Sequence, residues 1–342
     1  MPDLQHDLLQ RLFGRREYGL CLLILLVGAI VSFVDPHFLA RDNLRDILVR
    51  SAPTAIVACG VMLVVVTGEI DISVGSLLGL LAAVMGIFVS VSQWNWPMWI
   101  GLPLTLMIGT GIGFSTGVLV TFGRVPSIIA TLGLLTALRG TTTLIMRGEN
   151  IDGLPDRLQS MTKYGIVGVP LSLWIATVVI LFTAVLVKHT SLGRQLFALG
   201  SSNYSAEMIG LPSHKLKLFA FAYVGFLTAV ATIVDVPRLP KIEAGIGSGF
   251  ELLVVTCVVV GGVSISGGRG SLVGVLLAVV LLTMIRPVLT FLDVGESGEK
   301  WTKAIQGAFI ILAVITDSLV SQRLKRVRAV GRSSTATIAE VK

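Results

Sequence analysis

Charged side chains are scarce in this sequence. Asp, Glu, Lys and Arg make up 14% of its 342 residues, whereas an ordinary soluble domain carries about 25%. So little charge cannot cover a water-soluble surface, which excludes a soluble enzyme and a disordered chain. Hydrophobic residues reach 54% and the mean hydropathy is +0.87. These values predict an all-α integral membrane protein built from several helices.

Catalytic motifs are missing as well. The sequence contains neither HExxH nor GxSxG, the motifs of zinc proteases and serine hydrolases. The glycine-rich stretches 261–270 and 295–302 lack the Gly-Lys-Ser/Thr ending of a nucleotide-binding P-loop. We therefore expect a chain that is not an enzyme, binds no cofactor or metal, and does not hydrolyse ATP itself.

Cysteine is rare and forms no motif. Cys21, Cys59 and Cys257 all lie in apolar stretches, and their spacing gives neither a CxxC pair nor a metal site. We expect all three to be small buried apolar residues.

Long apolar runs divide the chain into membrane spans. Residues 72–123 contain no Asp, Glu, Lys or Arg and are too many for one span. Polar residues among tryptophans at 93–99 mark a membrane interface, so this stretch is predicted to be a hairpin of two helices. Acidic and basic residues alternate over 41–50, which predicts an interfacial helix before the next span. The prediction is about ten spans, or eight to nine if short segments re-enter: 20–34, 53–67, two within 72–123, 126–146, 164–187, 218–234, 252–262, 272–285 and 304–316.

The few charges predict a topology. Lys and Arg number 27 against 20 Asp and Glu, and the excess of +7 gathers at the chain ends and in the loop 188–217. This distribution is typical of cytoplasmic membrane loops and gives no reason to expect nucleic acid binding. Both termini and the loop 188–217 are thus predicted in the cytoplasm, and 147–163 outside. The domains are a cytoplasmic segment 1–19, one transmembrane domain 20–320 and a basic cytoplasmic tail 321–342.

The chain also repeats itself weakly. The segments that begin at Val64 and Val258 read VVVTGEIDISVGSLLGLLAAV and VVVGGVSISGGRGSLVGVLLAVV. In each, a short apolar run ends in Gly and polar residues before a second run begins, as in the interrupted helices of transporters built from internal repeats. An even number of predicted crossings separates the copies, which implies parallel repeats, although an error of one span would make them inverted.

Carboxylates occur at the first break. Glu69 and Asp71 lie between two apolar runs, where a charge is costly unless it faces a cavity or a partner. Two interpretations stay open: the carboxylates line a substrate path, or they are solvated or cap the next helix. Arg139 and Arg286 are placed near span ends, where we expect their side chains to extend to the interface.

A short helix is predicted inside the basic loop. Ser201, Ser202 or Asn203 can cap a helix over 204–209, which Gly210 and Pro212 end. Such a helix is either a docking element on the cytoplasmic side or an ordinary interfacial loop helix.

Four segments together resemble a known family, the permease subunits of bacterial ATP-binding-cassette importers for monosaccharides. This ribose-type group shares ancestry with branched-chain amino-acid permeases. The resemblance covers about 42–317 and is carried by GEIDISVG (68–75), VPSIIATLG with Arg139-Gly140 (125–140), GRQLFALGSSNYSAEMIG (193–210) and GSGFELL followed by VVVGGVSISGGRGS (247–271).

The resemblance implies roles for individual residues. A translocation path at the helix breaks is implied for Glu69, Asp71, Ser73, Thr131, Glu251, Ser264 and Ser266. Coupling to an ATPase through the central loop is implied for Gly193, Arg194, Gly200, Asn203, Ala206, Glu207 and Gly210. Two departures leave the sugar open: Glu69 stands where many members have Gly or Asn, and Ile285-Arg286-Pro287 replaces the usual Asn-Gly-Leu.

The family also implies partners and a mechanism. A cytoplasmic ATPase subunit, a periplasmic substrate-binding protein and a second permease copy or paralogue would assemble with this chain in the bacterial inner membrane. A monosaccharide such as a pentose or deoxyhexose would cross by alternating access. The alternative is an ion-coupled secondary transporter of a small polar solute, which needs a titratable residue buried in a span.

Overall fold

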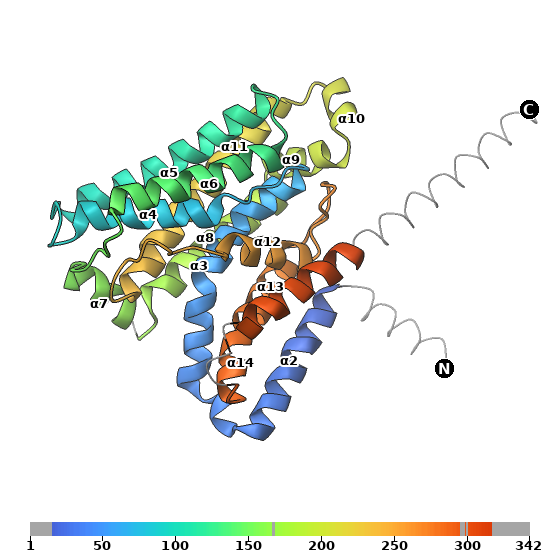
Figure 1. Cartoon of the computed structure of the whole chain (residues 1–342). Helices are drawn as coiled ribbons and strands as arrows, with labels where there is room; N and C mark the ends of the chain where they lie inside the picture. Colours follow the sequence, from blue (N-terminus) through green and yellow to red (C-terminus); the bar gives the residue numbers. More distant parts are fainter. Residues whose placement is uncertain (1–15, 166–167, 295–297, 299, 317–342) are drawn as a thin grey trace, which may run out of the picture.

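Helices make up most of the structure. This is expected in a membrane, where backbone N–H and C=O groups find no water and must hydrogen-bond to one another. The computed structural model describes residues 16–165, 168–294, 298 and 300–316 (Figure 1). Residues 300–316 are helical and carry no label. The labelled elements are α2 (Arg16–Val34), η1 (Pro36–Leu39), α3 (Arg41–Val66), α4 (Val74–Val89), α5 (Met98–Thr121), α6 (Ser127–Met146), α7 (Asp156–Tyr164), α8 (Leu171–His189), α9 (Ser191–Ser201), α10 (Asn203–Met208), α11 (Ser213–Asp235), η2 (Val236–Arg238), α12 (Phe250–Val260), α13 (Leu272–Thr283) and α14 (Ile285–Phe291).

Helix α3 lies at the centre of the bundle. Every residue from Ser51 to Val66 is buried, which requires neighbours on all sides. Those neighbours are α8, α11, α12 and α13. A helix that is apolar all round belongs in such a position, because no face of it needs water.

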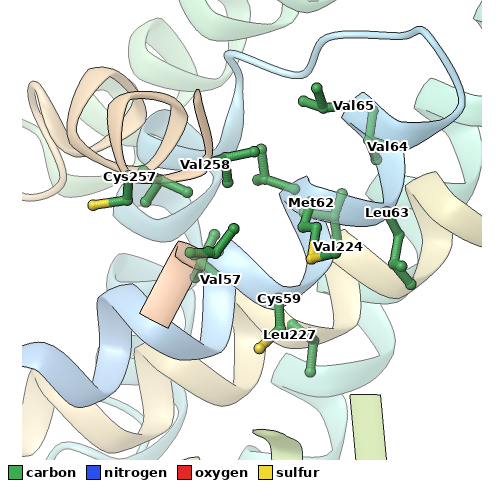
Figure 2. Close-up of a cluster of buried hydrophobic side chains, with 14 of the residues drawn as sticks. Val57, Cys59, Met62, Leu63, Val64, Val65, Val224, Leu227, Cys257 and Val258 are labelled. Carbon is green, nitrogen blue, oxygen red and sulfur yellow. The ribbon is translucent and has the colours of Figure 1, made fainter. Parts of the chain in front are cut away.

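The core forms where α3 meets α11 and α12. Figure 2 shows Val57, Cys59 and Met62 of α3 near Leu227 of α11 and Cys257 of α12. Each of these side chains is at most 1% exposed. Two of the predicted buried cysteines are thus confirmed, whereas the prediction for Cys21 was wrong, because it is exposed on α2.

Glycines bring α5 and α11 into close contact. Gly109, Gly113 and Gly117 recur every fourth residue of α5 and face α11. A Cβ atom on Gly113 would lie 2.4 Å from the carbonyl oxygen of Phe221 and 2.9 Å from Cα of Gly225. Small residues at this spacing let two helix backbones approach closely. Van der Waals contacts of this kind are a main source of helix–helix association energy in a membrane, because lipid tails are as apolar as the side chains and leave no hydrophobic effect between helices.

The two ends of the bundle differ in composition. One end, here the α10 end, holds α9, α10, the C-terminus of α3 and the loop 261–271, which contacts the backbone of α3. The opposite α7 end holds α7, η2 and the N-terminus of α3, joined partly by a bridge between Ile151 and Ile242. Figure 1 shows α10 and α7 at opposite extremes of the molecule.

The predicted all-α membrane fold is confirmed, with corrections to individual helices. Seven helices in the described part are long and apolar enough to span, while α4 and α12 are shorter, so a count of ten stays a prediction. The hairpin within 72–123 appears as α4 and α5 with a turn between them. The interfacial helix expected at 41–50 and the next span form the single helix α3.

One predicted boundary was wrong. The span expected at 164–187 begins only at Leu171, because Gly165 takes a φ of +67° and Pro170 precedes the first turn of α8. The segment before it forms the separate helix α7. The predicted segment 1–19 and tail 321–342 fall mainly outside the described residues; α2 already begins at Arg16.

We predict that Gly113→Ala destabilises the protein and that Gly111→Ala does not. The new methyl group at position 113 meets the backbone of α11, and overpacking of this kind costs about 1–3 kcal/mol. Gly111 lies on the same helix with no atom within 4 Å of its Cβ position. Thermal unfolding in detergent measures both; equal melting temperatures would contradict the close α5–α11 packing.

Candidate functional site

The two helix breaks predicted from the repeat meet at the α10 end. The backbone N–H of Gly268 donates a hydrogen bond of 2.8 Å to the carbonyl oxygen of Val66, the last residue of α3. Gly200 of α9 packs onto this bond, since a Cβ atom there would lie 1.8 Å from the same oxygen and 2.6 Å from the Gly268 nitrogen. Three segments therefore converge where no side chain fits. Both breaks lie at one end of the bundle, as a parallel repeat requires.

Glu69 joins the first break to α11. Its Oε1 lies 2.6 Å from Nζ of Lys217, and the two side chains are 16% and 19% exposed. The partner cation compensates the carboxylate, so this geometry holds the break in place.

Asp71 organises the start of α4. Its side chain is buried, and Oδ1 accepts hydrogen bonds from the backbone N–H and the hydroxyl of Ser73, at 2.8 and 2.7 Å. Nearby, the hydroxyl of Ser127 accepts from the N–H of Ile70 at 3.1 Å, and the hydroxyl of Thr131 donates to the carbonyl of Ser127 at 2.8 Å. These contacts are those of a turn that leads into a helix; a part in the substrate path stays a prediction.

The second break is a tight turn of backbone bonds. The N–H of Ser264 donates to the carbonyl oxygen of Arg269 at 3.0 Å, and the N–H of Gly267 donates back to the carbonyl of Ser264 at 2.9 Å. Ser266 is exposed beside Gly68. Six predicted path residues therefore share the α10 end.

Glu251 lies in the first turn of α12 and packs against the first turn of α4, next to the first break. Its Oε2 occupies the space beside Gly75, where a Cβ atom would come within 1.8 Å. Oε1 accepts from the N–H of Gly249 at 3.2 Å, while Oε2 is buried without a hydrogen-bond partner in the described part of the chain. An unsatisfied buried oxygen is unusual and marks this first turn of α12 as strained or functional.

Arg139 was predicted to extend to the interface, and that prediction was wrong. Its Nη1 donates a 2.7 Å hydrogen bond to the carbonyl oxygen of Ile246, in the loop that leads into α12. Gly79 of α4 leaves the room for this contact. The sequence did contain a signal for this contact: Arg139 is a lone arginine well inside an apolar helix, where a charge is costly unless it has a partner.

The central loop forms two helices, as the capping residues predict. The hydroxyl of Ser202 accepts from the N–H of Ser205 at 3.2 Å, and Gly210 ends the segment with a φ of +76°. The predicted helix over 204–209 is confirmed as α10, Asn203–Met208. Ala206 is buried, whereas three apolar side chains project outward: Tyr204, Met208 and Ile209, which are 76%, 72% and 74% exposed. We call these three residues the α10 apex.

The remaining coupling residues lie along the same loop. Gly193 packs on the end of α8, where a Cβ atom would lie 2.3 Å from the carbonyl oxygen of Leu186. Arg194, Asn203 and Glu207 are exposed. Buried glycines thus attach the loop to the bundle, and its polar and apolar side chains face outward.

Cavities with some charged and polar residues in a mainly apolar wall open at the α7 end, where sequence reasoning predicted none. Two adjoining cavities of about 500 and 440 Å³ share six lining residues: Asp235, Phe250, Leu253, Arg286, Thr302 and Gln306. Arg286 is exposed and lies in the wall of both cavities, and its predicted extension to the interface stays a prediction. The signal was a pair of charges, Asp235 and Arg286, near the ends of otherwise apolar runs.

Comparison with known proteins identifies the family. The family described as "Branched-chain amino acid transport system / permease component" matches residues 43–314. The ribose import permease protein RbsC of Haemophilus influenzae is 34% identical over 305 residues, which are 88% of this chain and 92% of that protein. RbsC of Escherichia coli K12 is 35% identical over 299 residues, 86% of this chain and 91% of that protein.

A second group of relatives is also similar. The autoinducer 2 import system permease protein LsrC of Escherichia coli (strain K12 / DH10B) is 29% identical over 313 residues, 92% of this chain and 90% of that protein. No solved structure matches the chain. With a matching family over most of its length and close-packed helix breaks at the positions of the shared motifs, the chain belongs to the permease components of the branched-chain amino acid transport system family.

Proposed function

We propose that this chain is the membrane-spanning permease subunit of an ATP-binding-cassette importer. It translocates a monosaccharide that a periplasmic binding protein delivers, and a separate cytoplasmic subunit supplies the energy from ATP. Relatives named for ribose import, matched over most of their length, support a sugar as substrate.

The α10 apex is the observation that carries this proposal. Three large apolar side chains on one short helix are costly to leave in water, and a cluster of this kind is typical of a protein-binding surface. The loop that contains it also carries Lys188, Arg194, Lys215 and Lys217, which favours the cytoplasmic side of the membrane. An ATPase subunit docked there would bury the apex.

The junction at Gly200 gives the docked helix a mechanical connection. Because α9 touches both Val66 and Gly268, a displacement of α9 and α10 acts on both helix breaks at once. Alternating access needs such a bistable contact, through which ATP binding and hydrolysis change the exposure of the path. The cavities at the α7 end then receive sugar from the binding protein, and a second permease copy completes the assembly.

Reconstitution tests the proposal directly. Liposomes that hold this permease with its ATPase and binding protein should accumulate labelled D-ribose or another monosaccharide only when ATP is supplied. Uptake driven by an ion gradient without ATP would contradict the proposal and favour a secondary transporter.

We predict that Met208→Asp abolishes co-purification of the ATPase while permease yield and melting temperature stay unchanged. A carboxylate in the apex places a charge in an interface that the apolar side chain would fill, and hot-spot changes of this kind cost about 2 kcal/mol or more. Val91→Asp is the control, because Val91 is 64% exposed but lies in the turn after α4, away from α10. If Met208→Asp retains the ATPase as well as Val91→Asp does, the apex is not the docking surface.

We predict that Gly200→Ala preserves ATPase docking but uncouples ATP hydrolysis from transport. The added Cβ atom collides with the Val66 carbonyl and must move α9 away from both breaks, while the α10 apex stays exposed. Ala198→Ser, on the exposed side of the same helix, is the control. The measurement is the ratio of sugar transported to ATP hydrolysed; an unchanged ratio in Gly200→Ala would refute this role for the junction.

A further inference from the structure

The cavities at the α7 end contain one arginine without a carboxylate partner in the part of the chain that the structure describes. Arg50 Nε lies 2.5 Å from Asp46 Oδ2, and Arg238 lies 3.6 Å from Asp235 and 3.9 Å from Asp46. Arg50, Arg238 and Asp235 all line the larger cavity. Two of its three arginines therefore have carboxylate partners.

Arg286 is the third, and its guanidinium has no ion pair or hydrogen bond in the part of the chain that the structure describes. It lies in the continuous apolar segment Leu272–Phe291. Its side chain is exposed and lines both cavities. An exposed cation in a cavity wall attracts an anion that arrives from outside the chain.

The other lining groups suit a polyhydroxylated ligand. Thr302 contributes a hydroxyl, Gln306 an amide and Phe250 an aromatic ring. The Thr302 hydroxyl donates to the carbonyl oxygen of Gly298 and can accept from a sugar hydroxyl. An amide can donate and accept, and an apolar ring packs on the C–H face of a sugar. The cavity volumes fall within the range of small-molecule sites, about 300–1,000 Å³.

We propose that these cavities bind a monosaccharide that carries a carboxylate, and that Arg286 holds the carboxylate. This inference rests on the proposed function as a sugar permease and narrows its substrate class to acidic sugars, such as aldonates and uronates. Arginine suits this role because its planar fork pairs with a carboxylate through two parallel hydrogen bonds.

A neutral sugar explains the site less well. Its hydroxyls can bond the guanidinium but cannot neutralise it, whereas a carboxylate forms the stronger, charge-assisted hydrogen bonds. An acidic sugar neutralises the guanidinium of Arg286 when it binds.

Direct binding to the full-length permease in lipid nanodiscs tests the inference. The probes are D-gluconate and D-glucuronate, with D-glucose and D-ribose as neutral counterparts, at millimolar concentrations. We expect the two acids to bind more tightly than the neutral sugars. Arg286→Gln should weaken acid binding about ten- to hundredfold, as for loss of a charged hydrogen bond, whereas Arg286→Lys should retain part of it. Arg157→Gln removes an exposed arginine of α7 at the same end and should change nothing.

Specific results would overturn the inference. These are no acid binding by the wild-type protein, neutral sugars bound as tightly as acids, or equal acid binding by Arg286→Gln and Arg157→Gln. Melting temperatures of all variants verify that they fold. The proposed function is rejected by a different result: the reconstituted importer shows no ATP-dependent uptake of any sugar. If neutral sugars alone are taken up with ATP, and Arg286→Gln does not change this uptake, the proposed function stands and the acidic substrate is rejected.

Discussion

A single backbone hydrogen bond, from Gly268 to Val66, connects the parts on which the structure depends. Each helix break frees backbone groups that lipid cannot satisfy. Here the two breaks satisfy one another, and Gly200 seals the contact because it has no side chain. The same contact therefore completes the fold and joins the central loop to both repeats.

The two ends of the bundle follow different chemical designs. At the first helix break of the α10 end the carboxylates are paired or capped: Glu69 with Lys217, and Asp71 with Ser73. At the α7 end Arg286 lines an open cavity without a partner in the described part of the chain. A break with compensated carboxylates can reorganise through its backbone contacts, whereas an unpaired cation in a cavity wall can bind a ligand.

Local patterns in the sequence predicted much of this arrangement, because their causes are local. Tryptophans at 93–99 predicted the α4–α5 turn, and Ser202 with Gly210 predicted α10, since a membrane interface and a helix cap each depend on a few neighbouring residues. The paired breaks were visible as a repeat. Their direct contact was not, because Val66 and Gly268 are brought together only by the packing of α3 against α12 and α13.

Charges inside apolar runs were harder to interpret. Arg139 and Arg286 look alike in sequence, and for both an extended side chain at the interface was expected. The structure gives one a backbone carbonyl and the other a cavity, and this difference arises from the distant segments at 246 and 300–316. Gly109, Gly113 and Gly117 were another available signal, whose partner helix only the tertiary structure identifies.

The shortness of α12 has a consequence for how the protein is built in the membrane. With 11 residues it is about 16 Å long, roughly half of the hydrocarbon core. Its preceding loop depends on Arg139 of α6, and its first turn packs on Gly75 of α4. A segment of this length is a poor substrate for independent insertion, so its placement requires that the earlier helices already stand in the bilayer. We therefore expect the first half of the chain to insert before α12 takes its place.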